Sequence, residues 1–515
     1  MTPVEQMSLE GKVGQLMMVG FDGTSLTPDL RRLIQELHLG GVIVFERNVE
    51  SPRQVAQLCA DLQSVAWEAG MPGLFVAIDQ EGGVVARLKE QKGFTEFPGA
   101  MAIAATGDIN NARRVAQAIS AELSALGINL DFAPDFDVNN NPVNPVIGVR
   151  SFGSNPDRVA DFGVAFLMAM QEAGILAVGK HFPGHGDTAI DSHIGLPTVL
   201  HDRARLQSIE FVPFLAAMRA NVAGIMSSHI TFPAIDPTPR LAATLSSRVL
   251  TDLLRREMGY EGLILTDELT MGALVTTGYP APRAALAAFK AGADLLLFQT
   301  GYEMHREAHA ALIYEVKSGE ISTDRLDESV KRILRAKKRF RILNPPAIDI
   351  EQITSRVGTK ANKKISREIA RQAVTVVRDD AHLIPLKPKS RTLVVETLAL
   401  GLGDRLDSTM KQVAAQPAVD EIKAVATVAR NFDTIVIATS DVAKNPTQAN
   451  LVDSLMKSDV PTFVVAVRSP YDLLYLKRAP SYLATYGTNP PMIDALAEIL
   501  TGKFKPRGKL PVALV

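Results

Sequence analysis

The chain has 515 residues, 46% of them hydrophobic and 22% charged, which is ordinary for a globular protein of two to four domains. Its net charge of −1 excludes a general electrostatic attraction to nucleic acid or to an anionic membrane surface. A single cysteine, Cys59, excludes an internal disulfide and a cysteine-based metal cluster.

The N-terminal residues, Met1 to Glu10, lack the basic segment and following apolar segment of a signal peptide. No run of roughly 18 uninterrupted apolar residues is present, so we expect no membrane span. We therefore expect a cytoplasmic protein, although a secreted form with its signal removed would look the same.

Eight short apolar runs recur over about 300 residues, and each ends at a polar residue. Polar groups just past the carboxyl ends of buried strands are where α/β enzymes place their chemistry. We interpret the runs as strands: Gln15–Gly20, Gly41–Phe45, Leu74–Ile78, Ile128–Leu130, Ile175–Val178, Val222–Met226, Leu263–Leu265 and Asp294–Phe298.

Helical patterns lie between these runs. The first begins with Ser51 as N-cap and Pro52 at the first helical position, and another is closed by Gly127. The alternation favours an α/β fold with an N-terminal (β/α)₈ barrel of TIM type over a doubly wound sheet, since polar groups follow strands along the whole run. The expected helices are Pro52–Ala69, Asn110–Leu126, Arg158–Ala173, Ala204–Ala220, Ser247–Met258 and Asp324–Phe340.

A chain break at Asn344-Pro345-Pro346 separates this region from a second set of apolar runs. We expect a catalytic barrel over residues 1–342, a linker over 343–365 and a smaller αβα sandwich domain over 366–515. The second set of runs is Ala373–Arg378, Arg391–Val395, Thr434–Ala438 and Thr462–Val467.

The segment from Lys180 to His193 is the densest in chemistry, with three His, two Asp and one Lys in fourteen residues. Pro183 and the nearby glycines exclude a regular helix there. We therefore expect a loop of groups that hold, donate or accept protons, directly after the strand that ends at Gly179.

Four sequence blocks resemble glycoside hydrolase family 3, in its two-domain type. Within that family the Lys180 to His193 segment is typical of the β-N-acetylglucosaminidase (β-N-acetylhexosaminidase) branch rather than of the β-glucosidases. Leu383–Lys387, Ser469–Leu473 and Gly508–Pro511 resemble the family's second domain. The four blocks are Ile78–Gly83, Asn144–Gly153, Lys180–His193 and Leu265–Leu269.

The resemblance implies a retaining exo-β-N-acetylglucosaminidase that acts on cell-wall muropeptides or chitooligosaccharides and needs no cofactor. Asp267, where a strand meets its loop, would be the nucleophile, and His193 supported by Asp191 would be the acid/base. Sugar hydroxyls favour an array of carboxylate acceptors and cationic donors. The residues expected to hold the sugar are Asp79, Arg87, Arg150, Lys180 and His181. Asp131 and His229 also follow strands, and we expect them to support these residues rather than to touch the sugar.

Several alternatives stay open at this point. Asp267 could be a helix N-cap ahead of Leu269 to Leu274, with Glu268 as its nearest rival for the nucleophile. Because imidazole, unlike a carboxylate, does not repel inorganic phosphate, phosphate could replace water as acceptor and give a phosphorylase. A metal-dependent barrel hydrolase is more remote, and one Trp with 6% aromatics disfavours a carbohydrate-binding module. The metal ligands would be His181, His185, Asp187 and His193.

Overall fold

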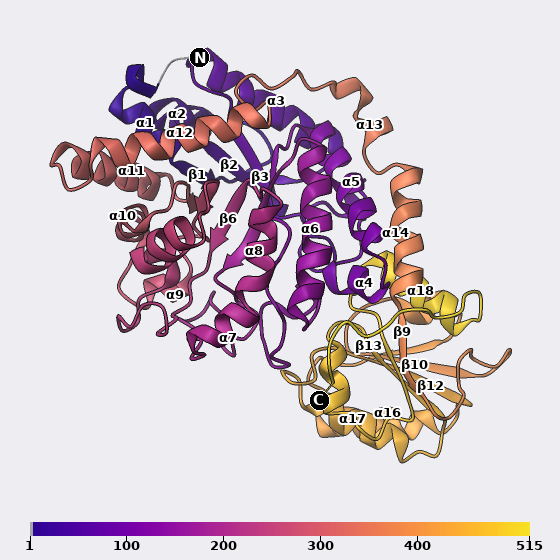
Figure 1. Cartoon of the computed structure of the whole chain (residues 1–515). Coiled ribbons are helices and arrows are strands. Elements are labelled where there is room, and N and C mark those ends of the chain that lie inside the picture. Colours follow the sequence, from indigo (N-terminus) through magenta and orange to yellow (C-terminus); the bar gives the residue numbers. More distant parts are fainter. Residues whose placement is uncertain (1–3, 515) are drawn as a thin grey trace.

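The computed structural model describes residues 4–514 as two packed domains, and their elements follow in chain order in Figure 1. The first three residues of the expected catalytic domain and the last residue of the expected second domain lie outside this range. No helix within residues 4–514 is long and apolar enough to cross a membrane.

The first domain is an eight-stranded parallel barrel. Its strands follow the order β7-β6-β5-β4-β3-β2-β1-β8, and a parallel bridge between Leu265 and Leu295 joins the two ends of the sheet. This confirms the barrel expected from the sequence. The strands are β1 (Met17–Gly20), β2 (Gly41–Val44), β3 (Phe75–Ile78), β4 (Leu130–Asp131), β5 (Leu176–Phe182), β6 (Gly224–Ser227), β7 (Leu263–Leu265) and β8 (Leu296–Phe298).

Helices cover the outside of the barrel (Figure 1). Ser51 caps the helix that Pro52 opens, and Gly127 ends another in the left-handed conformation, as the sequence predicts. The helices are α1 (Leu9–Gln15), α2 (Pro28–Leu37), α3 (Pro52–Glu68), α4 (Ala100–Ala105), α5 (Ile109–Leu126), α6 (Pro156–Glu172), α7 (Arg203–Ser208), α8 (Phe211–Arg219), η6 (Arg248–Glu257), α9 (Gly272–Val275), α10 (Ala281–Ala291), α11 (Tyr302–Lys317) and α12 (Thr323–Arg339).

Two expected helices differ from the prediction. The single helix expected over Ala204–Ala220 is two helices, α7 and α8, because Pro213 has no N–H for the carbonyl of Ile209 and its ring clashes with that carbonyl. The segment expected as an α-helix over Ser247–Met258 is wound as a π-helix, η6.

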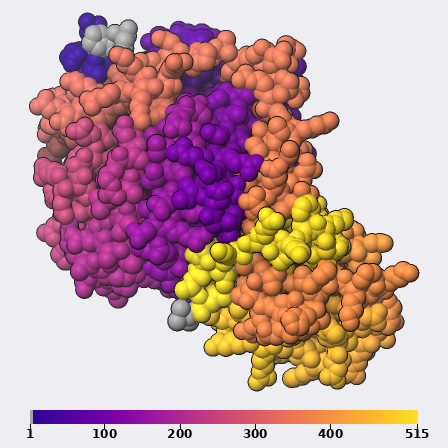
Figure 2. Space-filling view, turned by 45° about the vertical axis from the view of Figure 1, so that its right-hand side comes forward, coloured from indigo at the N-terminus to yellow at the C-terminus, as the bar shows by residue number. Residues whose placement is uncertain are grey.

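The chain reaches the second domain along one side of the barrel, through η7 (Ile350–Gln352), α13 (Ile353–Arg356) and α14 (Lys360–Ala373) (Figure 1). Helix α14 thus begins inside the segment 343–365 expected as a linker, and the three domain limits stay a prediction. Figure 2 shows the orange α14 region and the yellow C-terminal region packed against the purple barrel.

The second domain is a six-stranded sheet of order β11-β10-β12-β13-β14-β9, parallel except for β9 against β14. The sequence pattern missed the exposed edge strand β11 and the short strand β14. The elements are β9 (Thr375–Asp379), β10 (Thr392–Glu396), α15 (Leu402–Arg405), β11 (Thr409–Gln412), α16 (Val419–Ala429), β12 (Thr434–Thr439), α17 (Thr447–Met456), β13 (Thr462–Ala466), β14 (Ser481–Ala484) and α18 (Pro490–Leu500).

Lys337 of α12 is fully buried against the barrel. Its Nζ donates to Gln15 Oε1 at 2.8 Å and lies 4.9 Å from the centre of the Phe75 ring. Burial lowers the pKa of this ammonium from 10.5 to about 7. Burying Lys337 therefore lowers the free energy of unfolding at every pH at which this lysine is charged in the unfolded chain.

We expect Lys337→Met to raise the free energy of unfolding by on the order of 3 kcal/mol near neutral pH. Between about pH 7 and 10.5 the unfolded state binds more protons at this lysine than the folded state, so the wild type gains stability as pH rises through that window. The advantage of the variant should then be largest below pH 7 and shrink toward pH 10. Urea unfolding at several pH values measures it, with the exposed Lys338→Met as control. A stability gain of Lys337→Met that does not change with pH would contradict the lowered pKa of Lys337.

Candidate active site

The carboxyl ends of the barrel strands surround a cavity of about 320 Å³, and among residues 4–514 its lining comes from the barrel alone. Asp191 does not line the cavity, but it hydrogen-bonds His193, which does. The tertiary structure thus brings together groups that are spread over almost 190 positions of the sequence. The predicted site residues that line the cavity are Asp79, Arg87, Arg150, Lys180, His181, His193 and Asp267.

One wall of this cavity is a chain of paired charges. Lys180 Nζ lies 2.9 Å from Asp79 Oδ1 and 2.7 Å from Glu81 Oε1, and the lysine side chain is only 2% exposed. Arg150 binds Glu81 with two hydrogen bonds of 3.0 and 2.8 Å, and Arg87 Nη2 lies 3.1 Å from Asp79 Oδ2. Each buried charge therefore has an opposite charge within hydrogen-bond distance.

The pKa values follow from this pairing. Burial alone would raise the pKa of Asp79 and Glu81, but Lys180 and the two arginines outweigh it and hold both pKa values well below the ordinary range. Burial likewise opposes the charge of Lys180, and the carboxylates raise its pKa above the ordinary value. All three groups stay ionised across the neutral range.

Strand β5 carries Lys180 and His181, which corrects the sequence prediction. The loop expected to begin at Lys180 begins instead after Phe182, the last residue of β5. Phe136 N–H donates to the carbonyl of Lys180 at 2.7 Å, and Phe182 pairs with Ser227 of β6, so neighbours on both sides keep this segment extended. The apolar pattern ended too early because the residues that face the cavity are polar.

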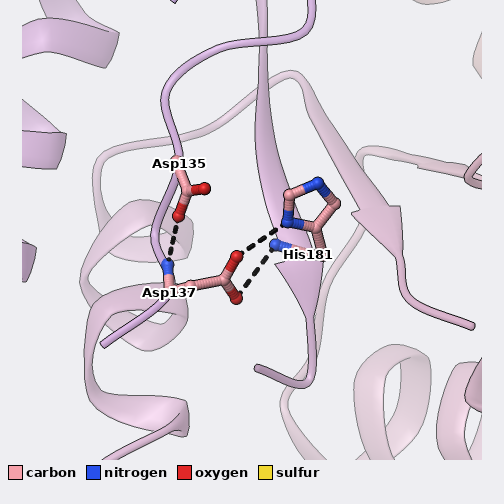
Figure 3. Close-up of side chains that lie close together, drawn as sticks. All are labelled: Asp135, Asp137 and His181. Atoms are coloured by element: carbon pink, nitrogen blue, oxygen red, sulfur yellow. Dashed lines mark hydrogen bonds and ion pairs between the residues drawn. The ribbon is translucent and has the colours of Figure 1, made fainter. Parts of the chain in front are cut away.

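Two aspartates that follow β4 lie on one side of His181, with Asp137 bound to it and Asp135 bound to Asp137 (Figure 3). Asp137 Oδ2 lies 2.7 Å from His181 Nδ1, while its Oδ1 accepts the N–H of His181 at 3.3 Å and of His185 at 2.6 Å. The Asp137 N–H in turn donates to Asp135 Oδ1 at 2.8 Å. Since Nδ1 faces a carboxylate, it carries the imidazole proton, and Nε2 is left as an acceptor, with Arg150 Nη2 3.4 Å away.

Burial sets the protonation of this cluster. Burial and the nearby Arg150 lower the pKa of His181 to about 4, so the ring is neutral at pH 7. Burial raises the pKa of Asp137 to about 6, and burial with the neighbouring Asp137 raises that of Asp135 well above the ordinary value. The cluster therefore holds fewer charges than its residue types suggest.

Asp135, Asp137 and His181 are the one group within residues 4–514 whose ligand atoms all lie within 4.8 Å of one another, as a metal ion would require. Their contacts favour a hydrogen-bond cluster instead. Asp137 already accepts three N–H groups, and the Arg150 Nε lies 3.8 Å from Asp135 Oδ2, where its charge would repel a cation.

The ligand set expected for a metal-dependent hydrolase does not assemble as a group. His185 bonds Thr188 and Ser192 through its two ring nitrogens, at 2.9 and 3.0 Å. Asp187 binds His201 instead. His185 and Asp187 therefore bind different protein partners and do not share a metal site with His181 and His193.

Asp267 follows β7 by two residues and projects into the cavity. The Glu268 N–H donates to Asp267 Oδ1 at 2.7 Å. Burial raises the pKa of Asp267, but the imidazoles of His229 and His181 and this N–H outweigh burial and lower it. The next helix, α9, begins only at Gly272 with Met271 as its N-cap, so the N-cap alternative for Asp267 is wrong.

Glu268 is a poorer candidate for the nucleophile than Asp267. Its Oε1 accepts the N–H groups of Thr270 and Gln299 at 2.8 and 3.0 Å, and its Oε2 accepts the Thr270 hydroxyl at 2.7 Å. Burial also raises its pKa. Both carboxylate oxygens are thus engaged with the protein, whereas Asp267 remains directed at the cavity.

His229 and Asp131 lie behind the cavity wall and do not line it. His229 is bound at both nitrogens, to Thr244 Oγ1 at 2.9 Å and to the Glu268 carbonyl at 2.8 Å. Asp131 Oδ1 accepts the Gln80 N–H at 2.9 Å, and burial raises the pKa of Asp131 to about 8. These contacts fit the supporting role expected for both residues.

The loop after β5 carries His193, the residue that the sequence predicts as the acid/base. His193 Nδ1 lies 2.8 Å from Asp191 Oδ1, and the His193 side chain is 62% exposed. Two backbone bonds fix the loop to α9, from Gly272 N–H to the His193 carbonyl and from Ala273 N–H to the Ser192 carbonyl, both at 3.2 Å. The exposed imidazole is therefore held at the cavity by Asp191 in its own loop and by the distant helix α9.

Sequence reasoning missed several residues of the site. Glu81 lies within the block Ile78–Gly83 but was given no role, although its pairing joins Arg150 to Lys180. Asp135 and Asp137 follow β4 as polar residues after a strand, which was the signal that could have found them. Ser192 and Gly272 had no recognisable signal, because their roles depend on contacts between distant segments.

Comparison with known proteins decides the family. The sequence model described as "Glycosyl hydrolase family 3 N terminal domain" matches residues 8–336, more than half of the chain. The chain belongs to glycosyl hydrolase family 3. This confirms the family recognised from the sequence blocks and identifies the barrel as that of a glycoside hydrolase.

Individual relatives agree with this assignment. A beta-hexosaminidase A from Pseudoalteromonas piscicida is 37% identical over 391 residues, which are 72% of this chain but only 64% of that protein. A beta-hexosaminidase from Alkalilimnicola ehrlichii is 40% identical over 291 residues, 55% of this chain and 80% of that protein. The chain thus spans less than two thirds of the length of the first of these relatives.

Solved structures extend the likeness to both domains. A glycoside hydrolase family 3 beta-N-acetylglucosaminidase from Paenibacillus sp. str. FPU-7 superposes with a TM-score of 0.94 at 39% identity, over 99% of each chain. The beta-glucoside phosphorylase BglX has a TM-score of 0.82 at 23% identity over 99% of this chain and 95% of that one, which shows a shared fold alone.

Gly272 tests how the loop that carries His193 is held. A Cβ at this position would lie 2.6 Å from the His193 carbonyl oxygen and 2.9 Å from that of Ile194. We expect Gly272→Ala to displace the loop and to slow hydrolysis of unactivated aryl glycosides by about 10-fold or more, as misplaced catalytic groups do.

The matched control is Gly195→Ala in the same loop, where the nearest atom to an added Cβ is 3.8 Å away. Steady-state kinetics and thermal unfolding of both variants separate a local displacement from a loss of stability. Equal rates for the two variants would contradict the role of Gly272.

Proposed function

We propose that this protein is a retaining exo-β-N-acetylglucosaminidase, which removes terminal N-acetyl-β-D-glucosamine from cell-wall muropeptides or chitooligosaccharides. One observation carries the proposal. A low-pKa carboxylate, Asp267, and an exposed imidazole with its own carboxylate partner, His193 with Asp191, belong to the same cavity. The relatives named hexosaminidase and N-acetylglucosaminidase support the choice of sugar.

In the first step Asp267 attacks the anomeric carbon of the terminal sugar. Its depressed pKa keeps it an anion at neutral pH, as a nucleophile must be. The attack forms a glycosyl–enzyme ester and breaks the bond to the leaving oxygen, which His193 protonates. In the second step His193 takes a proton from water, which attacks the same carbon and releases Asp267.

Asp191 acts on this chemistry through His193. Its Oδ1 accepts from both the backbone N–H and the Nδ1 side of His193, at 2.9 and 2.8 Å. The proton on Nδ1 is thereby fixed, so that Nε2 exchanges the proton with the substrate. An imidazole thus replaces the second carboxylic acid that glycosidases more often use.

The paired charges of the wall fit the hydroxyl groups of one sugar. Asp79 can accept from adjacent hydroxyls, while Lys180, Arg150 and Arg87 donate, and neutral His181 presents Nε2. The cavity is closed beneath by the buried side chains of the barrel strands, and its volume of about 320 Å³ suits one terminal sugar rather than the interior of a long chain. This supports an exo action on terminal residues.

The test is an assay with two aryl glycosides, each with and without inorganic phosphate. We expect N-acetyl-β-glucosaminides to be cleaved far faster than β-glucosides, with free N-acetylglucosamine as product whether or not phosphate is present. Asp267→Asn should abolish turnover without unfolding the protein, since losing such a nucleophile raises the barrier by on the order of several kcal/mol.

Three results would contradict parts of this proposal. A sugar 1-phosphate product would show phosphate as the acceptor, and preference for glucosides would overturn the sugar. A mechanism-based fluorosugar that labels Glu268 instead of Asp267, found by peptide mass spectrometry, would overturn the nucleophile. A substrate of the cell-wall muropeptide or chitooligosaccharide type and a cytoplasmic location stay predictions from the sequence.

His193→Ala should separate the two chemical steps. A dinitrophenolate leaves with little protonation, so its first step should survive, whereas a phenyl substrate should lose activity by a much larger factor. Without a base to activate water, the glycosyl–enzyme formed from the dinitrophenyl substrate should accumulate and appear as a burst of released dinitrophenolate. Asp191→Ala should give a milder version, because the imidazole remains.

The control is His201→Ala, since His201 is also paired with an aspartate, Asp187, but does not line the cavity. It should leave the ratio of phenyl to dinitrophenyl rates unchanged. Equal losses for both leaving groups in His193→Ala would exclude His193 as the acid.

A further inference from the structure

The segment 139–150 forms a thin wall between two cavities. On one side lies the substrate cavity, and on the other a small cavity of about 50 Å³ between the barrel and the second domain. Val146 lines both cavities. At Val146 a single residue therefore separates the cavity between the domains from the substrate cavity.

Neighbouring residues of the wall face opposite ways. Val149 is 6% exposed and belongs to a hydrophobic core shared with the second domain, which includes Tyr471 and Val394. The next residue, Arg150, lines the substrate cavity and holds Glu81 with two hydrogen bonds.

The loop after β3 repeats the arrangement. Val84 packs against the same shared core and lines the cavity between the domains, whereas Val85 lines the substrate cavity. The second domain thus supports both barrel segments that contribute the paired charges, the one with Asp79 and Glu81 and the one with Arg150.

Hydrogen bonds to the second domain hold the 139–150 wall at its first residue, at its middle and just beyond its last residue. The buried Tyr471 hydroxyl donates to the Asn139 carbonyl at 2.8 Å. Near the C-terminus the Pro511 carbonyl accepts the Ser154 N–H at 3.2 Å. The exposed Lys444 Nζ donates to the Pro145 carbonyl at 2.7 Å, a bond that water weakens.

We propose that the second domain positions Arg150 for substrate binding by bracing the 139–150 wall, with Val149 and Tyr471 as positioning residues. The proposal rests on the function proposed above. A shifted wall would loosen the Arg150–Glu81 pair, and Glu81 also holds Lys180 at 2.7 Å, so a movement outside the cavity would disturb two cationic groups inside it. The nucleophile Asp267 lies on another strand and would keep its place.

The test uses two pairs of matched variants in the full chain. Val149→Ala and Val394→Ala remove the same two methyl groups from the same shared core, but only Val149 adjoins Arg150. Tyr471→Phe removes the hydroxyl that binds the Asn139 carbonyl. Its control, Tyr475→Phe, removes a hydroxyl that also lies at the cavity between the domains, from a side chain that is 45% exposed.

We expect both valine variants to lower the melting temperature, but only Val149→Ala and Tyr471→Phe to raise KM for an aryl N-acetyl-β-glucosaminide, by about 3–10-fold, with a smaller change in kcat. In an Arg150→Ala background neither substitution should raise KM further, because both act through Arg150. Equal KM values within each pair, or full additivity with Arg150→Ala, would overturn the proposal.

Hydrogen exchange of the same variants gives a readout that needs no turnover. Backbone amides of residues 139–153 should exchange faster in Val149→Ala and Tyr471→Phe than in their controls. If no N-acetylglucosaminide were cleaved, the proposed function would fail while this comparison would still decide whether the wall is braced. Unchanged exchange in the wall would overturn the brace even in an active enzyme.

Discussion

The burial of the Lys180 ammonium is the constraint on which the site depends. A charge that is 2% exposed needs opposite charges at hydrogen-bond distance, and Asp79 and Glu81 supply them at 2.9 and 2.7 Å. Removing one partner of such a buried pair costs roughly 3–5 kcal/mol, because the remaining charge stays in the low-dielectric interior. The strands and loops that carry these groups are therefore held in one arrangement, and the same charges are already oriented when a sugar arrives.

The two halves of the chemistry lie in different physical settings. The charges that would hold the sugar, together with Asp267, come from β3, β5, β7 and the segments beside them, which are buried and tied to one another. His193, the proposed acid/base, is largely exposed and is held through Asp191 and two backbone bonds to α9. In the proposed mechanism the buried paired charges would fix the position of the sugar, while the accessible imidazole would exchange protons with the leaving group and with water.

Up to residue 514, where the described chain ends, the second domain contributes no side chain to the substrate cavity, yet it is packed against the barrel segments behind it (Figures 1 and 2). Arg150 has to meet Glu81 with a bidentate geometry that tolerates little displacement. It ends a single 3₁₀ turn, Gly148–Arg150, in a segment otherwise without regular structure, and such a segment is mobile unless something packs on its far side. Core packing through Val149 provides such support, and a domain without catalytic groups can in this way bear on substrate affinity.

The sequence by itself determined the barrel, because eight buried strands leave apolar runs and their polar ends mark one rim. It also predicted the residues that line that rim, such as Asp267 just past β7 and Asp79 just past β3. It did not predict the end of β5, where polar residues face the cavity. It also did not predict the break between α7 and α8, where Pro213 outweighs a continuous apolar pattern. Only the tertiary structure decided the partners: Glu81 with Arg150, Asp137 with His181, and Gly272 with the loop of His193. These pairs join residues far apart in the chain, and a local pattern of residue types carries no information on which distant charges meet, since that depends on how the folded strands and loops are placed.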